Sequence, residues 1–137
     1  MSISYGAEEA ARHLFGIDDG KQIYRALMRL TKAPDALTFS AAQTALDLSV
    51  ASRHVHITTS QSRAIQGVVE GVPGQEHVLF NIGASTFTIE NNSASATGSP
   101  VLTSTGATLT MTAGGSALLW WDENVSKYRA VVLFAGN

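Results

Sequence analysis

Two histidines of this chain have the residue type and the spacing that most resemble those of metal ligands. His54 and His56 are one residue apart, so in a β-strand both imidazoles would lie on the same side, as chelation requires. No third ligand is near in the sequence, although a symmetric trimer would bring six such nitrogens to its axis. The simpler interpretation is a pair of exposed histidines on a polar face beside Thr58. We therefore predict no metal and no other cofactor.

Two glutamates are the residues of this chain that most resemble a catalytic acid/base pair. Glu70 and Glu76 flank the turn Gly71–Gly74, but two solvated loop carboxylates are the better explanation of this spacing. The chain contains no Gly-x-Ser-x-Gly elbow, no Walker A loop and no Gly-x-Gly-x-x-Gly fingerprint. The sequence therefore predicts that the protein is not an enzyme and has no catalytic residues.

Two adjacent tryptophans could bind a sugar. Trp120 and Trp121 offer large aromatic surfaces of the kind on which sugar rings stack. Aromatic side chains of this size also dominate protein cores and protein interfaces. Adjacent residues of a strand point to opposite faces, so we expect one tryptophan in the core and the other in an interface.

The composition excludes several classes of partner. The 137 residues carry a net charge of −2, which gives no electrostatic case for nucleic acid or for an anionic membrane. Only 15% of the residues are charged, against about a quarter in an average soluble domain. Cysteine is absent, the apolar runs are far too short to span a membrane, and the N-terminus has no signal-peptide pattern.

The secondary-structure elements that position these residues fall into two parts of the chain, one helical and one made of β-strands. Residues 1–35 have the pattern of two short helices, and the second carries an apolar stripe that includes Ile23, Leu27 and Leu30. Two such helices bury little by themselves, so they need a surface to cover. That surface is either the rest of this chain or another protein, to which this segment would be an anchor or arm.

Residues 36–137 have the pattern of a β-domain. Apolar and polar residues alternate at Leu46 and Leu48, at Val55 and Ile57, and around Leu109. Ser and Thr supply fourteen of the thirty-four residues from Gly83 to Ser116. Eight or nine short strands with a turn signal about every ten residues favour a mainly β fold, namely an antiparallel sandwich or barrel.

Two strands near the C-terminus are apolar at consecutive positions. Ala117–Trp121 and Ala130–Phe134 do not alternate, so each strand presents apolar side chains to both faces of its sheet. One face would line the core, and the other would meet the N-terminal helices or, as we favour, a neighbouring subunit. The predicted partner-interface residues are Ile23, Leu27, Leu30, Trp120, Trp121 and Val132.

Two stretches within residues 44–134 combine apolar strands with glycine-containing turns. One is Ile65, Gly67-Val68, Gly71, Gly74, His77-Val78-Leu79-Phe80-Asn81 and Thr86-Phe87-Thr88-Ile89. The other is Thr105-Gly106, Leu109-Thr110-Met111, Gly114 to Asp122 and Tyr128-Arg129-Ala130-Val131-Val132. Together they resemble the small β-domains of tailed-bacteriophage virion proteins, which occur in tail fibres, baseplate proteins, head fibres and capsid decoration (cement) proteins.

The resemblance implies a homotrimer without enzymatic activity, located in the virion and assembled in the bacterial cytoplasm. The short chain has no repetitive shaft, which favours a separately encoded capsid decoration protein or short head fibre over a tail fibre. Its partners would be copies of itself and the major capsid protein or another virion protein. The alternative is a receptor-binding or glycan-binding module of a tail fibre or baseplate, with Trp120 or Trp121 and the loop Asn91–Pro100 as contacts.

Overall fold

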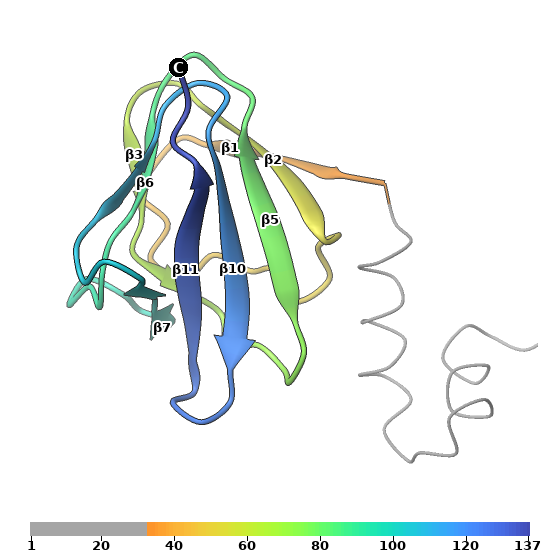
Figure 1. Cartoon of the computed structure of the whole chain (residues 1–137), viewed down its shortest axis with the longest axis vertical. Coiled ribbons are helices and arrows are strands. Elements are labelled where there is room, and N and C mark those ends of the chain that lie inside the picture. Colours follow the sequence, from red (N-terminus) through yellow and green to blue (C-terminus); the bar gives the residue numbers. More distant parts are fainter. Residues whose placement is uncertain (1–32) are drawn as a thin grey trace, which may run out of the picture.

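The computed structural model describes residues 33–137, which form eleven β-strands and no helix (Figure 1). The strands lie in a six-stranded sheet, a three-stranded sheet and a two-stranded sheet. The prediction of a mainly β domain is confirmed. The strands are β1 (Asp35–Phe39), β2 (His54–Thr59), β3 (Arg63–Ile65), β4 (Gly67–Val68), β5 (Glu76–Asn81), β6 (Phe87–Ile89), β7 (Ser99–Pro100), β8 (Leu102–Thr103), β9 (Leu109–Met111), β10 (Ser116–Asp122) and β11 (Lys127–Phe134).

Three strands of the large sheet are parallel and recur at a regular interval. β1, β2 and β5 lie side by side, with Asp35 opposite Val55 and Val55 opposite Leu79. Successive passes through the sheet are therefore separated by about 20 to 24 residues, a period typical of solenoids. Parallel neighbours need a crossover between them. Here the crossovers run through the small strands instead of through helices.

The crossovers stack on one another in the same order. Gln43 pairs with Ile65 in a parallel bridge, and β3 in turn pairs in parallel with β6. Backbone bonds join these turns, for example from the Gln43 N–H to the Ala64 oxygen at 2.8 Å. A Cβ at Gly67 would lie 2.7 Å from the Cβ of Ala96, so only glycine allows this close approach. The first half of the domain is thus a short solenoid-like winding.

The second half of the chain completes the sheets with antiparallel strand pairs. β10 pairs antiparallel with β5 and with β11, and β9 pairs antiparallel with β6. The order of the large sheet is β1-β2-β5-β10-β11-β8, and the β11–β8 pair is again parallel. The predicted antiparallel arrangement of the strands was therefore wrong, because the sheets are mixed. An alternating pattern identifies a strand but carries no information on the direction of its neighbour.

Most predicted strands are present, but the first strand was missed. β2, β9, β10 and β11 match predicted segments closely. The segment Thr44–Val50 alternates in burial as expected, yet it contributes only a single bridge, from Leu46 to Val68. Asp35–Phe39 forms an edge strand, whereas the sequence pattern assigned Asp35 to the end of the helical segment and indicated no strand at 36–39. The remainder of the predicted helical segment, residues 1–32, lies outside the described residues.

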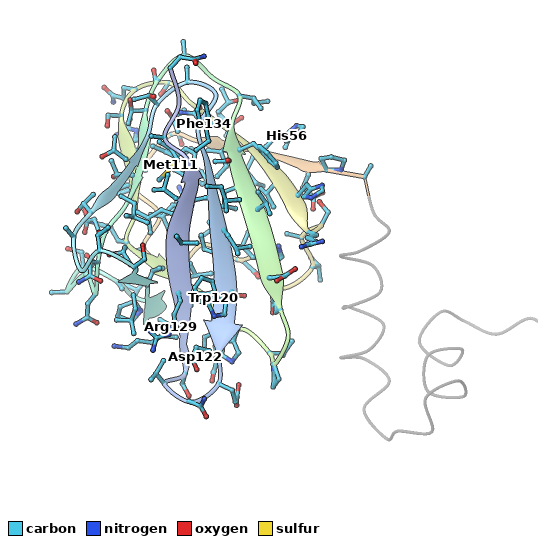
Figure 2. All side chains as sticks on the ribbon, viewed as in Figure 1. His56, Met111, Trp120, Asp122, Arg129 and Phe134 are labelled. Carbon is cyan, nitrogen blue, oxygen red and sulfur yellow. The ribbon has the colours of Figure 1, made fainter. Side chains whose placement is uncertain are left out.

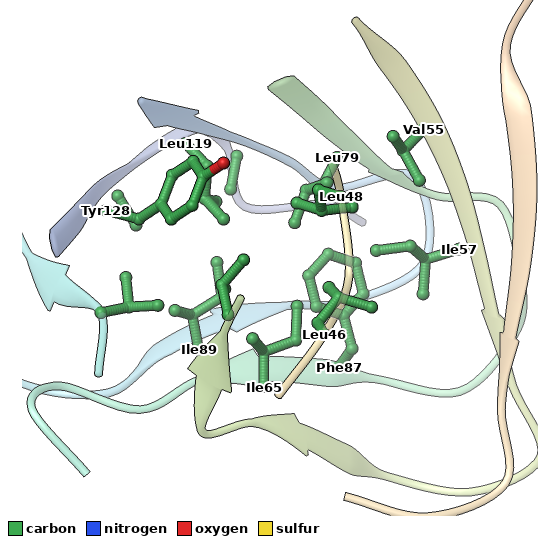
Figure 3. Packing of buried hydrophobic residues seen from close by; sticks show 14 of the residues in the cluster. Leu46, Leu48, Val55, Ile57, Ile65, Leu79, Phe87, Ile89, Leu119 and Tyr128 are labelled. Carbon is green, nitrogen blue, oxygen red and sulfur yellow. The ribbon is translucent and has the colours of Figure 1, made fainter. Parts of the chain in front are cut away.

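The core fills the space between the large sheet and the three-stranded sheet (Figure 3). Leu79, Leu119 and Tyr128 come from the large sheet, and Ile65 and Phe87 come from the opposite sheet; each is at most 1% exposed. β10 shows the alternation clearly, since Leu119 is buried and its neighbour Leu118 is only half-buried. One face of the large sheet therefore lines the core. The other face is the outer face.

Buried polar side chains tie the two sheets together. The amide of Asn81 donates to the backbone oxygens of Ser85 at 2.8 Å and Met111 at 2.9 Å, and its oxygen accepts from the Gly83 N–H at 3.1 Å. Asn81 is 1% exposed, so these bonds replace its lost hydration. They hold the end of β5 against the last residue of β9 and fix the loop that follows β5.

Replacing Leu119 with alanine should destabilise the domain far more than replacing Leu118. Leu119→Ala removes a fully buried side chain and should lower the free energy of unfolding by about 2–5 kcal/mol. Leu118→Ala acts on the outer face and should cost less than about 1 kcal/mol in a single chain. Urea denaturation at a protein concentration low enough to keep the chain monomeric measures both. Equal losses would contradict the assignment of faces.

Candidate functional site

The outer face of the large sheet carries a band of apolar side chains that nothing in the described part of the chain covers. One cross-strand row joins His54, Val78, Leu118 and Val131, each opposite the next. Facing residues share one side of a sheet. Leu118 and Val131 are half-buried, although no strand within residues 33–137 forms a second layer over them. This band runs from β2 to β11.

A second row lies nearer the C-terminal end of β11. It joins His56, Phe80, Ser116 and Phe134 across the same four strands. Phe134 is 55% exposed, an unusually high value for a phenylalanine. Figure 2 shows Phe134 and His56 near one end of the sheet and Trp120 near the other.

The predicted interface residues are divided between the two faces. Trp120 is half-buried on the outer face, opposite Glu76 on β5 and Arg129 on β11. Trp121 is 5% exposed, belongs to the core, and donates from its indole N–H to a carboxylate oxygen of Glu123 at 2.5 Å. Val132 packs against the core from the inner side. The predicted residues Ile23, Leu27 and Leu30 lie outside the described residues.

Trp120 lines a shallow groove of about 360 Å³ on the outer face. The groove also has a charged pair beside it, because the guanidinium of Arg53 lies 2.6 Å from the carboxylate of Glu76. Both side chains are about 40% exposed, so their charges remain hydrated. The groove is formed by Gly74, Gln75, Glu76, Leu118, Trp120, Trp121 and Val131.

An ion pair holds the hairpin beside Trp120. Nε of Arg129 donates to a carboxylate oxygen of Asp122 at 2.6 Å, and the Asn124 N–H donates to the other at 3.0 Å. The bond from Arg129 lowers the pKa of Asp122 below its ordinary value of 3.8. Desolvation opposes this shift, and the Asn124 N–H adds to it. Arg129 is thereby fixed in the same row as Trp120.

The two histidines of the candidate metal site lie on the outer face, and both contact the same aromatic ring on the neighbouring strand. His54 and His56 each contact Phe80 edge-on, with ring centroids 5.8 Å apart in both cases. Across residues 33–137, no group of three or more histidine, aspartate or glutamate side chains gathers as metal ligands. Within one chain, this arrangement provides an aromatic cluster on the outer face.

The two glutamates of the candidate acid/base pair do not share a site. Glu76 borders the groove at Trp120, whereas Glu70 lines a different hollow of about 540 Å³. That second hollow also includes Thr97–Ser99, which belong to the loop Asn91–Pro100. The loop and Trp120 therefore border separate depressions of the surface.

His77 is a buried polar residue whose role no sequence motif revealed. It is fully buried; its Nδ1 lies 2.8 Å from the backbone oxygen of Ser52, and its Nε2 lies 2.9 Å from Nε2 of Gln75. A carbonyl only accepts, so Nδ1 carries the proton and Nε2 accepts from the amide. Ser52 in turn exchanges bonds with Asp35 at 2.7 and 2.9 Å. This chain of bonds positions β1.

Comparison of the chain with protein-family models, with curated proteins and with solved structures finds no match. In the part of the chain that the structure describes, no helix has the length and apolar character to cross a membrane. The candidate site is therefore defined by the geometry of the outer face alone.

Asp122 should make the stability of the domain sensitive to acid. Its pKa is lowered in the folded state, so the ionised carboxylate stabilises the fold above pH 3.8, and this contribution is lost as the pH falls through the folded-state pKa. Asp122→Asn should lower the free energy of unfolding at pH 7, and the difference from wild type should disappear in acid. Denaturation curves between pH 7 and pH 2.5 measure this difference.

Glu70→Gln is the matched control, because Glu70 is exposed. It should leave the free energy of unfolding within about 0.5 kcal/mol of wild type at pH 7. A constant gap between Asp122→Asn and wild type across the whole pH range would contradict the role given to the carboxylate.

Proposed function

We propose that this protein is a non-enzymatic structural protein of a bacteriophage virion, a homotrimer that decorates and stabilises the capsid shell. The observation that carries the proposal is the apolar band on the outer face of the large sheet. Leu118, Val131 and Phe134 lie there without a covering layer in the described part of the chain. A contiguous exposed apolar band marks an interaction site.

The chemistry of the band favours a protein partner with an apolar surface. Its centre is aliphatic and aromatic, and its charges lie toward one end in the pairs Arg53–Glu76 and Arg129–Asp122. Interfaces between subunits have this composition, with an apolar centre and a polar rim. A second copy of the same face is such a partner.

The resemblance to small virion β-domains supports the location of the protein. In that group homotrimers without enzymatic activity are typical, and the low charge and hydroxyl-rich surface of this chain agree with it. In this proposal residues 1–35 are the capsid-facing anchor, and the β-domain is the outward part of the trimer. The protein would be located in the virion after assembly in the host cytoplasm.

A second candidate function is suggested by the groove at Trp120. A half-exposed indole beside the Arg53–Glu76 pair combines a stacking surface with hydrogen-bonding groups, as glycan-binding sites require. A receptor-binding module of a tail fibre or baseplate would use it. Trp120→Ala should then abolish binding to host cells or to their surface polysaccharide while the fold is retained.

The purified chain of 137 residues should have a solution mass of three times 14.4 kDa and should bind undecorated capsids. Val131→Asp places a charge in the apolar band, so it should give a folded monomer. Val125→Asp is the control, because Val125 is 41% exposed in the turn between β10 and β11 and outside the band. Analytical ultracentrifugation measures the mass, and circular dichroism verifies folding.

Binding to capsids decides between the two functions. The proposal predicts saturable binding at the local three-fold positions of the shell, visible by electron microscopy. A wild-type monomer would contradict the trimer. Absence of binding at every stage of capsid assembly would rule out decoration and leave the glycan-binding alternative.

A further inference from the structure

Two histidine side chains lie within the apolar outer face of the large sheet. His54 stands level with Val78, and His56 stands level with Phe80. Both imidazole rings contact the ring of Phe80 edge-on, at a centroid distance of 5.8 Å in each case. His54 is exposed and His56 is half-buried, so both can take up protons from water in a single chain. A contact that covers Phe80 would cover both imidazoles as well.

The end of the outer face at which His56 lies exposes large apolar side chains (Figure 2). Phe134 stands in the row of His56 and is 55% exposed. Ile82 follows Phe80 on the outer side of β5, since side chains alternate along a strand, and it is 58% exposed. The Ile82 N–H donates to the Ile57 oxygen at 3.0 Å, so pairing with β2 continues to this residue. This end of the face therefore gains most from being covered.

The other titratable side chains of the large sheet point inwards, are paired, or lie at the far end. On β1, β5, β10 and β11 they are Asp35, Glu76, His77, Asp122, Lys127, Tyr128 and Arg129. Asp35 is level with the buried Val55, and His77 is fully buried. Glu76 is paired with Arg53, which precedes β2, and the last four belong to the β10–β11 hairpin. In the described strands, the rows of His54 and His56 contain no other charged residue.

We propose that His54 and His56 make the self-association of the outer face depend on pH, so that copies of the chain associate at neutral pH and separate as both side chains become charged in acid. This inference rests on the homotrimer proposed above and adds a control on its contact. Histidine is the side chain that ordinarily changes charge between pH 5 and 8. Water solvates this charge in a separate chain, whereas an apolar contact excludes that water.

The direction of the effect follows from the number of protons bound in each state. Burial disfavours the charged form of an imidazole, so the associated copies bind fewer protons than the separate chains. Lowering the pH therefore favours the separate chains. Each histidine that must stay neutral lowers the association constant about tenfold for every pH unit below its titration range. Symmetry repeats His54 and His56 in every copy, so the response of the whole assembly is steep.

Sedimentation equilibrium of the 137-residue chain at pH 7.5 and pH 5.5 tests the proposal. The concentration at which half of the chains are associated should rise at least about tenfold at pH 5.5, with an unchanged circular dichroism spectrum. The double variant His54→Gln/His56→Gln should stay associated at both pH values. His54→Leu/His56→Leu is a second variant should the first not fold or associate. Thr58→Val is the matched control, because Thr58 continues the outer side of β2, and it should keep the acid response.

The other outcomes separate this inference from the proposed function. A trimer equally stable at both pH values would overturn the pH dependence and leave the proposed function standing. Acid dissociation that persists in both double variants, or loss of the fold at pH 5.5, would overturn it in favour of another group such as the buried His77. Dissociation by EDTA at pH 7.5 would overturn it in favour of a metal held by the histidines. A monomer at pH 7.5 would overturn both proposals.

Discussion

Parallel stacking of β1, β2 and β5 is the constraint on which the rest of this structure depends. Each pass must return to the same end of the sheet before the next begins, so the chain winds through the second sheet and carries β3 and β6 with it. Gly67 lets one turn approach the next, and the polar chain from Gln75 through His77 to Ser52 secures β1. The hydrophobic core fills the interior of this winding, between the large sheet and the three-stranded sheet.

A winding of this kind has an open end by its nature. Every internal strand has two neighbours, but the first strand has one, and a terminal turn needs a cap or a partner. At the other side of the large sheet, antiparallel β10 and β11 end the parallel pattern, and the short β8 leaves half of β11 uncovered. The open edges and the apolar outer face therefore have a common origin in the topology.

The polar side chains at the outer face of the large sheet are engaged with their neighbours. Arg53 and Glu76 form an ion pair at its rim, and the histidines His54 and His56 contact Phe80. What the sheet offers is backbone edges and apolar area. These are the means by which copies of a chain associate, and they require no chemistry from side chains.

The sequence by itself determined that this is a β-domain, where most of its longer strands lie, and that β10 and β11 carry apolar residues on both faces. It did so because side chains alternate along a strand whatever its neighbours are. Strand direction, the edge position of Asp35–Phe39, the buried role of His77 and the separation of Trp120 from Trp121 and Val132 depend on contacts between residues far apart in the chain. Only the tertiary structure decided these features, because alternation is the same in a parallel and in an antiparallel strand.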